Sequence, residues 1–314
     1  MGAVLRRLAA AAATLVLVSV LVFVAVDALV DRAALELGRG ATQEALAARR
    51  ALLGLDRPWL VRLFEHVASA LSFDLGESAR RGLPVAEVIR RALAPTLAYA
   101  LPGFVLATVL GVFGGLWAAR ARGWVDRAVL AASTLLMSTS GVLVAVLGQY
   151  LLAHRLRWFP VLGWPLGGDG RGAPGFIVLP ALLWAVIQVG ADLRHYRAVF
   201  VRELAAPHLE GLRARGIGER RITGHVLRGA VAPVLARVSG RLPQAVLGGV
   251  VVEHVFNIPG LGALLVAAIR EADVTVVQGV ALALAAATVG GQTICDGLAA
   301  WLDPRVRARW EAGR

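Results

Sequence analysis

Six stretches of the chain are apolar over lengths close to that needed to cross a membrane. An α-helix crosses the hydrocarbon core of a bilayer with about 20 mostly apolar residues. The stretches cover residues 8–30, 96–119, 129–153, 176–191, 235–255 and 277–301. The fourth is short, and the fifth contains Arg237 and Arg241. The chain is therefore expected to be an all-α integral membrane protein with about six transmembrane helices.

The composition agrees with a membrane protein and argues against a nucleic-acid-binding function. Hydrophobic residues make up 58% of the 314 residues and charged residues only 17%, with a mean hydropathy of +0.69. These values are far from the averages of soluble domains. A net charge of +12 would suit nucleic acid only if it gathered in one patch of a soluble fold. Here the basic residues lie between apolar stretches, so we expect no nucleic-acid partner.

All 33 basic residues are arginine, and the absence of lysine excludes two kinds of catalysis. A Gly-rich phosphate-binding loop needs a lysine that reaches the β- and γ-phosphates, and Schiff-base enzymes need a lysine amine. Cys295 is the single cysteine, so neither a disulfide nor a cysteine metal cluster can form within the chain. The six histidines lack the spacing of metal ligands. We therefore expect no catalytic residue, no metal site and no bound cofactor.

The distribution of arginine predicts the orientation in the membrane. Short cytoplasmic loops carry an excess of arginine. With six spans, both termini share one side with residues 119–128 and 193–233, and this set has the larger excess of arginine over acidic residues. Both termini are therefore expected to be cytoplasmic. The first stretch follows Arg6 and Arg7, as a signal peptide would, but its length and the lack of a small-x-small cleavage site favour a retained helix.

The chain is interpreted as a single transmembrane domain, residues 1–314, with a first helix at 8–30 and a core of five helices within 96–301. Residues 31–92 form the longest outer segment, in which ten arginines nearly balance eight acidic residues. Residues 41–53 read as a helix, and residues 59–75 read as an amphipathic stretch suited to the outer membrane interface. Residues 193–233 form the most basic cytoplasmic loop.

Residues 210–216 in that loop read Glu-Gly-Leu-Arg-Ala-Arg-Gly, and residues 225–233 end in Pro233. This arrangement resembles the signature loop of the permease subunits of binding-protein-dependent ABC importers. In that pattern a Glu-Ala-Ala, three residues and a Gly are followed by a helix and a proline. Glu210 and Gly216 match the pattern, whereas Gly211 and Leu212 stand where two alanines are usual.

Four further blocks resemble the dipeptide, oligopeptide and nickel branch of the same family. The blocks are Gly-Leu-Asp-Arg-Pro-Trp at 54–59, Phe-Asp-Leu-Gly-Glu-Ser at 73–78 with Pro-Val-Ala-Glu-Val-Ile at 84–89, Val-Val-Val-Glu-His-Val-Phe-Asn-Ile-Pro-Gly-Leu-Gly at 250–262, and Leu-Asp-Pro-Arg at 302–305. They occur in the family's order across nearly the whole chain. The resemblance implies a type I ABC importer permease fold in a bacterial inner membrane.

The resemblance also implies that residues 210–216 form a short coupling helix that docks on a cytoplasmic ATPase. Pro207 suits a first helical turn, and Gly216 can adopt the left-handed conformation that ends a helix. Leu209 and Leu212 share one face and are expected to insert into the partner, while Arg213 and Arg215 meet acidic groups on it. The alternative is an ordinary basic loop that obeys the positive-inside rule.

Arg237 and Arg241 share a helix face, with Gln244 close to it. Because arginine facing lipid at mid-depth is costly, we expect these residues to line the translocation path or to pair with a sister permease. The alternative is that the helix begins late and both arginines snorkel to the cytoplasmic interface. Glu253, with residues 257–262, is expected to form an outer gate or a docking surface for the solute-binding protein.

The sequence thus predicts a translocation subunit of an ATP-driven importer, with di- or oligopeptides as the substrate that the branch implies. The implied partners are a second permease subunit, expected as a heterodimer, two ATPase subunits that use ATP and Mg²⁺, an extracytoplasmic solute-binding protein and membrane lipid. The alternatives are a self-sufficient secondary transporter or channel and a membrane-embedded enzyme. The enzyme would need a clustered nucleophile or metal constellation that the sequence does not show.

Overall fold

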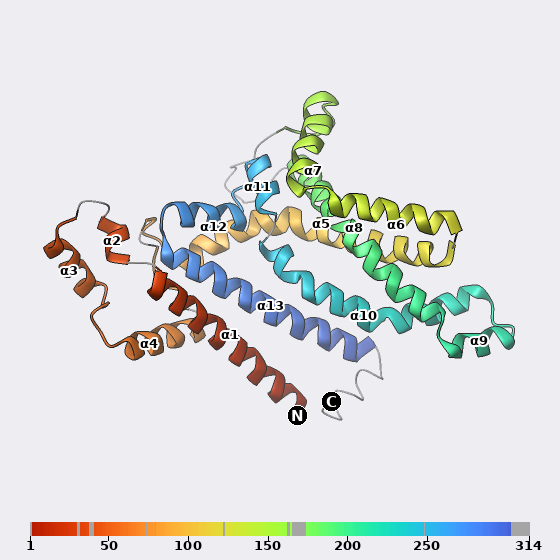
Figure 1. Ribbon diagram of the computed structural model, residues 1–314, viewed down its shortest axis with the longest axis horizontal. Helices are drawn as coiled ribbons and strands as arrows, with labels where there is room; N and C mark the ends of the chain where they lie inside the picture. Colours follow the sequence, from red (N-terminus) through yellow and green to blue (C-terminus); the bar gives the residue numbers. More distant parts are fainter. Residues whose placement is uncertain are drawn as a thin grey trace. The chain divides into compact units, whose positions relative to one another are not determined.

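The computed structural model describes residues 2–29, 32–37, 41–72, 74–78, 80–121, 123–161, 164, 174–247 and 249–302. These residues form helices joined by short connections, with one isolated bridge between Glu77 and Pro84 (Figure 1). They divide into two compact units. The first unit comprises Met1–Ala94 and Gly260–Gly290, and the second comprises Pro95–Pro259 and Gly291–Arg314.

The first unit contains the amino-terminal helix and the segment expected outside the membrane. Its helices are α1 (Gly2–Leu29), α2 (Arg32–Leu37), α3 (Gln43–Leu52), α4 (Trp59–Leu71), α12 (Leu261–Arg270) and the first half of α13 (Val274–Leu302). The expected helix within residues 41–53 is present, and the Thr42 side chain caps it by accepting a hydrogen bond from the amide of Ala45.

Helix α4 packs along α1 (Figure 1). The ring of Trp59 meets that of Phe23 edge-on at 5.9 Å, and the Arg62 guanidinium donates to the Asp27 carboxylate at 2.6 Å. The other face of α4 exposes large apolar side chains, including Leu60 and Phe64. The expected amphipathic stretch is therefore a helix with one face on α1 and an apolar face left exposed, as suits a membrane interface.

Ion pairs tie the outer segment to the start of α13 within the first unit. Asp273 is 1% exposed and accepts hydrogen bonds from the Ser78 hydroxyl at 2.5 Å and from Arg81 at 3.2 Å. Arg81 also pairs with Glu271 at 2.9 Å. Ser78, the last residue of the motif at 73–78, thus has a structural role, because its hydroxyl satisfies a buried carboxylate.

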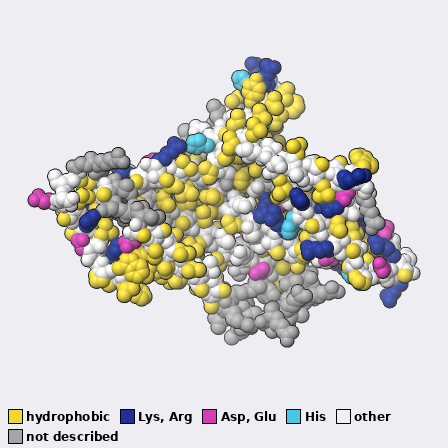
Figure 2. All heavy atoms as spheres, viewed as in Figure 1, with side chains coloured by type: hydrophobic (Ala, Val, Ile, Leu, Met, Phe, Trp, Pro, Cys, Tyr) yellow, Lys and Arg dark blue, Asp and Glu magenta, His cyan; other side chains and the backbone are white. Residues whose placement is uncertain are grey.

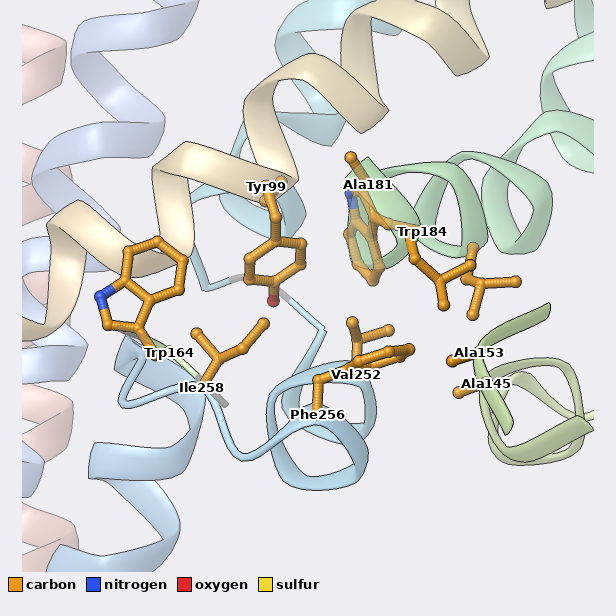
Figure 3. Close-up of a cluster of buried hydrophobic side chains, with 12 residues drawn as sticks. Tyr99, Ala145, Ala153, Trp164, Ala181, Trp184, Val252, Phe256 and Ile258 are labelled. Carbon is orange, nitrogen blue, oxygen red and sulfur yellow. The ribbon is translucent and has the colours of Figure 1, made fainter. Parts of the chain in front are cut away.

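The second unit contains most of the expected core. Its helices are α5 (Val85–Ala121, which begins in the first unit), α6 (Gly123–Ser138), α7 (Gly141–Gly148), the π-helix η1 (Gln149–Arg155), α8 (Pro174–Leu204), α9 (Pro207–Ala214), α10 (Glu219–Leu247) and α11 (Val250–Phe256). Buried side chains gather between α5, α8 and α11, where Tyr99, Trp184 and Phe256 lie together (Figure 3).

Glycines allow α5 to approach α8 closely. A Cβ added at Gly111 would lie 2.6 Å from the Cβ of Asp192, and one added at Gly115 would lie 2.7 Å from the backbone nitrogen of Arg197. Small residues at helix interfaces let backbones come close enough for dense van der Waals packing in a membrane. The close approach therefore fixes the part of α8 that carries Asp192.

Four of the six expected spans are single long helices, and two are broken. Ala9–Ala28, Val85–Ala121, Gly175–Leu204 and Val274–Leu302 are long and apolar enough to cross a membrane. The third stretch bends by 93° between α6 and α7. The fifth stretch is interrupted between α10 and α11, and the second bent pair that could count as one span consists of Glu219–Phe256 and Leu261–Arg270. The described part of the chain thus holds four candidate spans, or up to six if each bent pair counts as one.

The bend in the third stretch has a local cause that hydropathy does not show. The Ser138 and Thr139 hydroxyls bond back to the carbonyls of Thr134 and Leu135, at 2.9 and 2.8 Å. Such bonds bend or weaken helices. Ser140 is then extended and begins α7. An uninterrupted third helix was therefore the wrong expectation. The fifth stretch is interrupted at Gly249, whose extended backbone precedes α11.

Two loop boundaries also differ from the expected ones. Helix α5 begins at Val85 instead of near Thr96, and α8 continues to Leu204 instead of ending near Ala191. Both extensions carry charged residues. These residues lower the mean hydropathy, so the apolar stretch ends there, but the helix continues. Glu87 pairs with Arg90 and Arg91 one turn away, while Arg197 pairs with Asp126. The expected loop at 193–233 is therefore largely helical. Asp303 and Pro304, in the block at 302–305, lie outside the described residues.

Candidate coupling helix and buried polar clusters

The expected coupling helix is α9, and its end has the geometry of a Schellman motif. Pro207 is its first residue, and Gly216 has a φ of +72°. The amide of Gly216 donates to the carbonyl of Arg213 at 2.9 Å, and the amide of Ile217 donates to the carbonyl of Leu212 at 3.2 Å. These two bonds satisfy carbonyls that a helix end leaves unpaired. The left-handed conformation expected at Gly216 is therefore confirmed.

Leu209 lies in the chain's own core, and this overturns its expected insertion into a partner. The side chain is fully buried and packs in a cluster with Tyr196 and Phe200 of α8 and Ile222 of α10. Leu212 is partly buried against the same cluster. The sequence places both leucines on one face but does not reveal which surface they meet. Leu209 therefore anchors α9 to the ends of α8 and α10.

The opposite face of α9 is exposed and charged. Glu210, Arg213, Arg215 and Gly216 are exposed, and Arg213 pairs with Glu219 of α10 at 3.4 Å. Figure 2 shows basic and acidic side chains gathered around α9. The surface that α9 offers to another molecule thus consists of guanidinium, carboxylate and backbone groups.

A cavity of about 820 Å³ adjoins this helix. Its polar lining includes Arg120, Arg197, Arg213 and Arg220 together with Asp126 and Glu219. Arg197 pairs with Asp126, and Arg120 donates to the hydroxyl of Thr223 at 2.5 Å. The four arginines outnumber the two carboxylates, so the cavity favours an acidic group.

Arg237 and Arg241 lie in the middle of α10 and share a carboxylate partner on α8. Asp192 is fully buried; Arg241 pairs with it directly, and Arg237 approaches it at 3.4 Å. The Arg241 guanidinium also lies 5.6 Å from the ring centre of Phe104 on α5. Because α10 begins at Glu219, the alternative of a helix that begins late is wrong. The partner carboxylate of both arginines is in the same chain, and the expected pairing with a sister permease stays a prediction.

Sequence reasoning missed Asp192, although a signal was present. Asp192 lies directly after the fourth apolar stretch and directly before the expected loop at 193–233. An acidic residue near the end of one apolar stretch and two arginines inside another favour an ion pair between them. Gln244, the next residue expected at the path, accepts a hydrogen bond from Gln188 of α8 at 3.4 Å. The structure thus joins α8 and α10 through polar contacts at two levels.

Glu253 forms a second buried polar cluster. Its carboxylate is fully buried and accepts hydrogen bonds from the Thr96 hydroxyl at 2.7 Å and the Tyr99 hydroxyl at 3.2 Å. The Tyr99 oxygen also accepts from the amide of Gly249 at 2.8 Å, at the break before α11. A buried side chain cannot contact a soluble protein, so Glu253 does not form the expected docking surface.

The role of Glu253 in a gate stays a prediction. Thr96 and Tyr99 were missed because both lie within an apolar stretch, where nothing in the pattern shows their partner. Asn257 ends α11 in the left-handed conformation, so a turn forms at the start of residues 257–262. Among the described residues, no group of three or more His, Cys, Asp or Glu side chains could hold a metal ion.

Comparison with known proteins places the chain in one family over nearly its whole length. Residues 111–308 match the model for the inner membrane component of binding-protein-dependent transport systems, and residues 1–83 match the amino-terminal model of such membrane components. A putative peptide transport system permease protein of Brucella abortus is 34% identical over 309 residues, covering 97% of this chain and 98% of the relative.

Two further relatives extend the comparison. A glutathione transport system permease protein of Escherichia coli is 31% identical over 307 residues, covering 97% of this chain and 98% of the relative. A probable peptide ABC transporter permease protein of Sinorhizobium fredii is 29% identical, covering 97% and 98%. These matches and the long apolar helices agree on a multi-pass, non-catalytic inner membrane subunit with the type I permease fold. The chain belongs to the family of inner membrane components of binding-protein-dependent transport systems, the permease subunits of ABC importers.

Proposed function

We propose that this permease forms half of the translocation path of an importer for di- or oligopeptides. The relatives carry the words peptide or glutathione in their names, and glutathione is itself a short peptide. A solute-binding protein would deliver the peptide, and a second, homologous permease would complete the path. Separate ATPase subunits would use ATP and Mg²⁺, because this chain has no lysine for a phosphate-binding loop.

The proposed coupling to an ATPase rests on how α9 is attached to α8 and α10. Its buried face joins α8 and α10 through Leu209, and its exposed face carries Arg213, Arg215 and Gly216. An ATPase that moves the exposed face would therefore move the ends of two long helices as rigid bodies. The adjoining cavity, which favours an acidic group, would receive a carboxylate of the ATPase.

The same two helices carry the charged groups that we assign to the path. Asp192 lies on α8, whereas Arg237, Arg241 and Gln244 lie on α10. A relative movement of α8 and α10 would strain or break the pairing of Asp192 with Arg241. A guanidinium released in this way could meet a peptide carboxylate or carbonyl. Glu253, which lies on α11, is proposed as part of the gate on the other side.

The test is ATP-driven uptake by the reconstituted importer. The permease is co-purified with the subunits encoded beside its gene and placed in proteoliposomes, and uptake of labelled di- and tripeptides is measured with and without ATP. We expect uptake only when the ATPases, the binding protein and ATP are all present. Uptake by this chain alone would contradict the proposal, as would ATP-driven uptake of another solute that peptides do not compete with.

A further inference from the structure

A polar cavity of about 430 Å³ lies within the first unit, at the end of α1 that precedes the outer segment. Its lining comes from α1, α4, the loop after α3 and the first turns of α13. The polar side chains in its lining include Asp27, Arg62, His66, Ser69 and Gln278. None of these residues belongs to the coupling helix or to the two buried polar clusters described above.

An apolar cavity of about 250 Å³ continues from this polar one. Both cavities are lined by Ala70, Leu75 and Leu282. The apolar cavity extends between α1 and α13, from Ser19 to Leu15 on α1 and to Ala286 on α13. Leu15, Ser19, Phe23 and Asp27 are four residues apart and share one face of α1. From Asp27 to Leu15 the two cavities therefore follow α1 for about 18 Å at 1.5 Å per residue.

Two hydrogen-bond donors at the polar cavity are buried and unused. Gln278 is 5% exposed, and its Nε2 has no hydrogen-bond partner among the described residues. The Nε of Arg62 is likewise buried without a partner, although its terminal nitrogens donate to Asp27 at 2.6 and 3.3 Å. Buried donors are rarely left unpaired. Two such donors at one cavity indicate a ligand that supplies acceptor oxygens.

The charges around the cavity favour a ligand that carries both signs. Arg57 and Arg62 face three carboxylates, Asp27, Glu65 and Asp74. Arg57 pairs with Glu65 at 2.7 Å, and Arg62 pairs with Asp27. The excess of carboxylate disfavours a ligand that is only anionic. A phosphate that meets the unused donors would need a cationic group beside it.

We propose that these joined cavities bind one zwitterionic phospholipid with an ammonium group, of the phosphatidylethanolamine class. The phosphate lies against Arg62 and Gln278, the ammonium lies toward the carboxylates, and one acyl chain follows the apolar cavity between α1 and α13. The combined length of the two cavities along α1 suits a headgroup followed by the first carbons of one acyl chain, and the polar end lies where the first span ends, as a headgroup requires. The proposal does not depend on the identity of the transported solute.

The experiment measures lipid retained by the purified permease complex. The complex is delipidated in detergent, incubated with nanodiscs of equal phosphatidylethanolamine and phosphatidylglycerol, re-extracted and analysed by native mass spectrometry. We expect one retained phosphatidylethanolamine per permease chain, favoured at least tenfold over phosphatidylglycerol. Gln278→Met, which keeps the side-chain volume and removes the donor, and Ala283→Trp, which fills the apolar cavity, should each lower retention at least tenfold.

Matched variants control for general effects. Gln292→Met changes an exposed glutamine on α13, and Ala25→Trp adds the same bulk on the exposed face of α1; both should retain lipid normally. Circular dichroism checks folding, and if Ala283→Trp fails to fold, Gln278→Met decides alone. Equal retention of both lipids, or unchanged retention by Gln278→Met, would overturn the proposal. So would equally tight binding of glycerophosphoethanolamine, which lacks acyl chains, or of a peptide in place of lipid.

Discussion

At the scale of single residues, the buried carboxylate of Asp192 is the group whose loss the structure predicts to be most costly. Both of its arginine partners lie on α10, and Arg241 is almost completely buried. Removing one partner of a buried ion pair leaves an uncompensated charge. The pair thus holds α8 and α10 in one relative position, although an apolar pair of similar volume could hold them as well.

Asp192→Asn is expected to destabilise the permease by about 3–5 kcal/mol, because it leaves buried guanidinium charge without a carboxylate. Thermal unfolding of the purified chain in detergent measures this loss. The matched control is Asp126→Asn, whose pair with Arg197 is about one-fifth exposed, so its loss should be near 1 kcal/mol or less. The double variant Asp192→Leu with Arg241→Met should regain much of the stability. Equal losses for Asp192→Asn and Asp126→Asn would contradict this view of the buried pair.

Leu209 allows a test of which surface α9 buries. Leu209→Ala should lower the stability of the isolated chain by about 2–5 kcal/mol, as truncation of a buried leucine does. Arg215→Ala, on the exposed face, should leave stability unchanged and weaken binding of the ATPase. Thermal unfolding and co-purification with the ATPase separate the two effects. If Leu209→Ala weakened ATPase binding without lowering stability, its side chain would meet the partner after all.

At the scale of elements, the end of α9 determines how this helix would be presented to an ATPase under the proposed coupling role. The chain can turn at Gly216 only through a positive φ, which costs residues with a Cβ about 1–2 kcal/mol. The following helix α10 begins three residues later with Glu219 near its positive end. A rigid turn at this point lets α9 transmit a displacement instead of absorbing it.

Gly216→Pro is expected to abolish ATP-driven uptake while leaving membrane insertion intact. Proline fixes φ near −65° and removes the N–H that donates to Arg213. Gly211→Ala is the control, because Gly211 lies inside α9 and an added Cβ there meets nothing within 4 Å. Uptake assays in proteoliposomes and the yield of membrane-inserted protein give the two readouts. Normal uptake by Gly216→Pro would show that the turn does not transmit the movement.

At the scale of the whole molecule, the two bent helix pairs decide how many times the chain crosses the membrane. If each pair is one crossing, the total is six and both termini lie on the side of α9. If the chain in one of these pairs returns to the side of the membrane from which it entered, that pair is not a crossing. The segments before and after it then lie on the same side of the membrane. The arginine distribution favours six crossings.

Sidedness can be measured on a background without reactive thiols, because Cys295 is the single cysteine and is buried. In a Cys295→Ser chain we expect Arg215→Cys to react with an impermeant maleimide only from the cytoplasmic side. Arg57→Cys should react only from the outer side. Arg155→Cys, at the end of η1, should also react from the outer side if α6, α7 and η1 together cross the membrane once. Reaction of Arg155→Cys and Arg215→Cys from the same side would show that α6 and α7 form a re-entrant loop instead of a crossing.

The sequence by itself determined the fold class, the family, the position of the short helix α9 and the conformation of Gly216. Each of these follows from local patterns: runs of apolar residues, motifs in order, and a glycine placed where a helix must end. Only the tertiary structure decided what each side chain meets. Asp192 with Arg241, Tyr99 with Glu253, and Leu209 within the chain's own core join residues that are far apart in sequence. Hydropathy reports how apolar a residue is, whereas burial and pairing depend on which helices pack together.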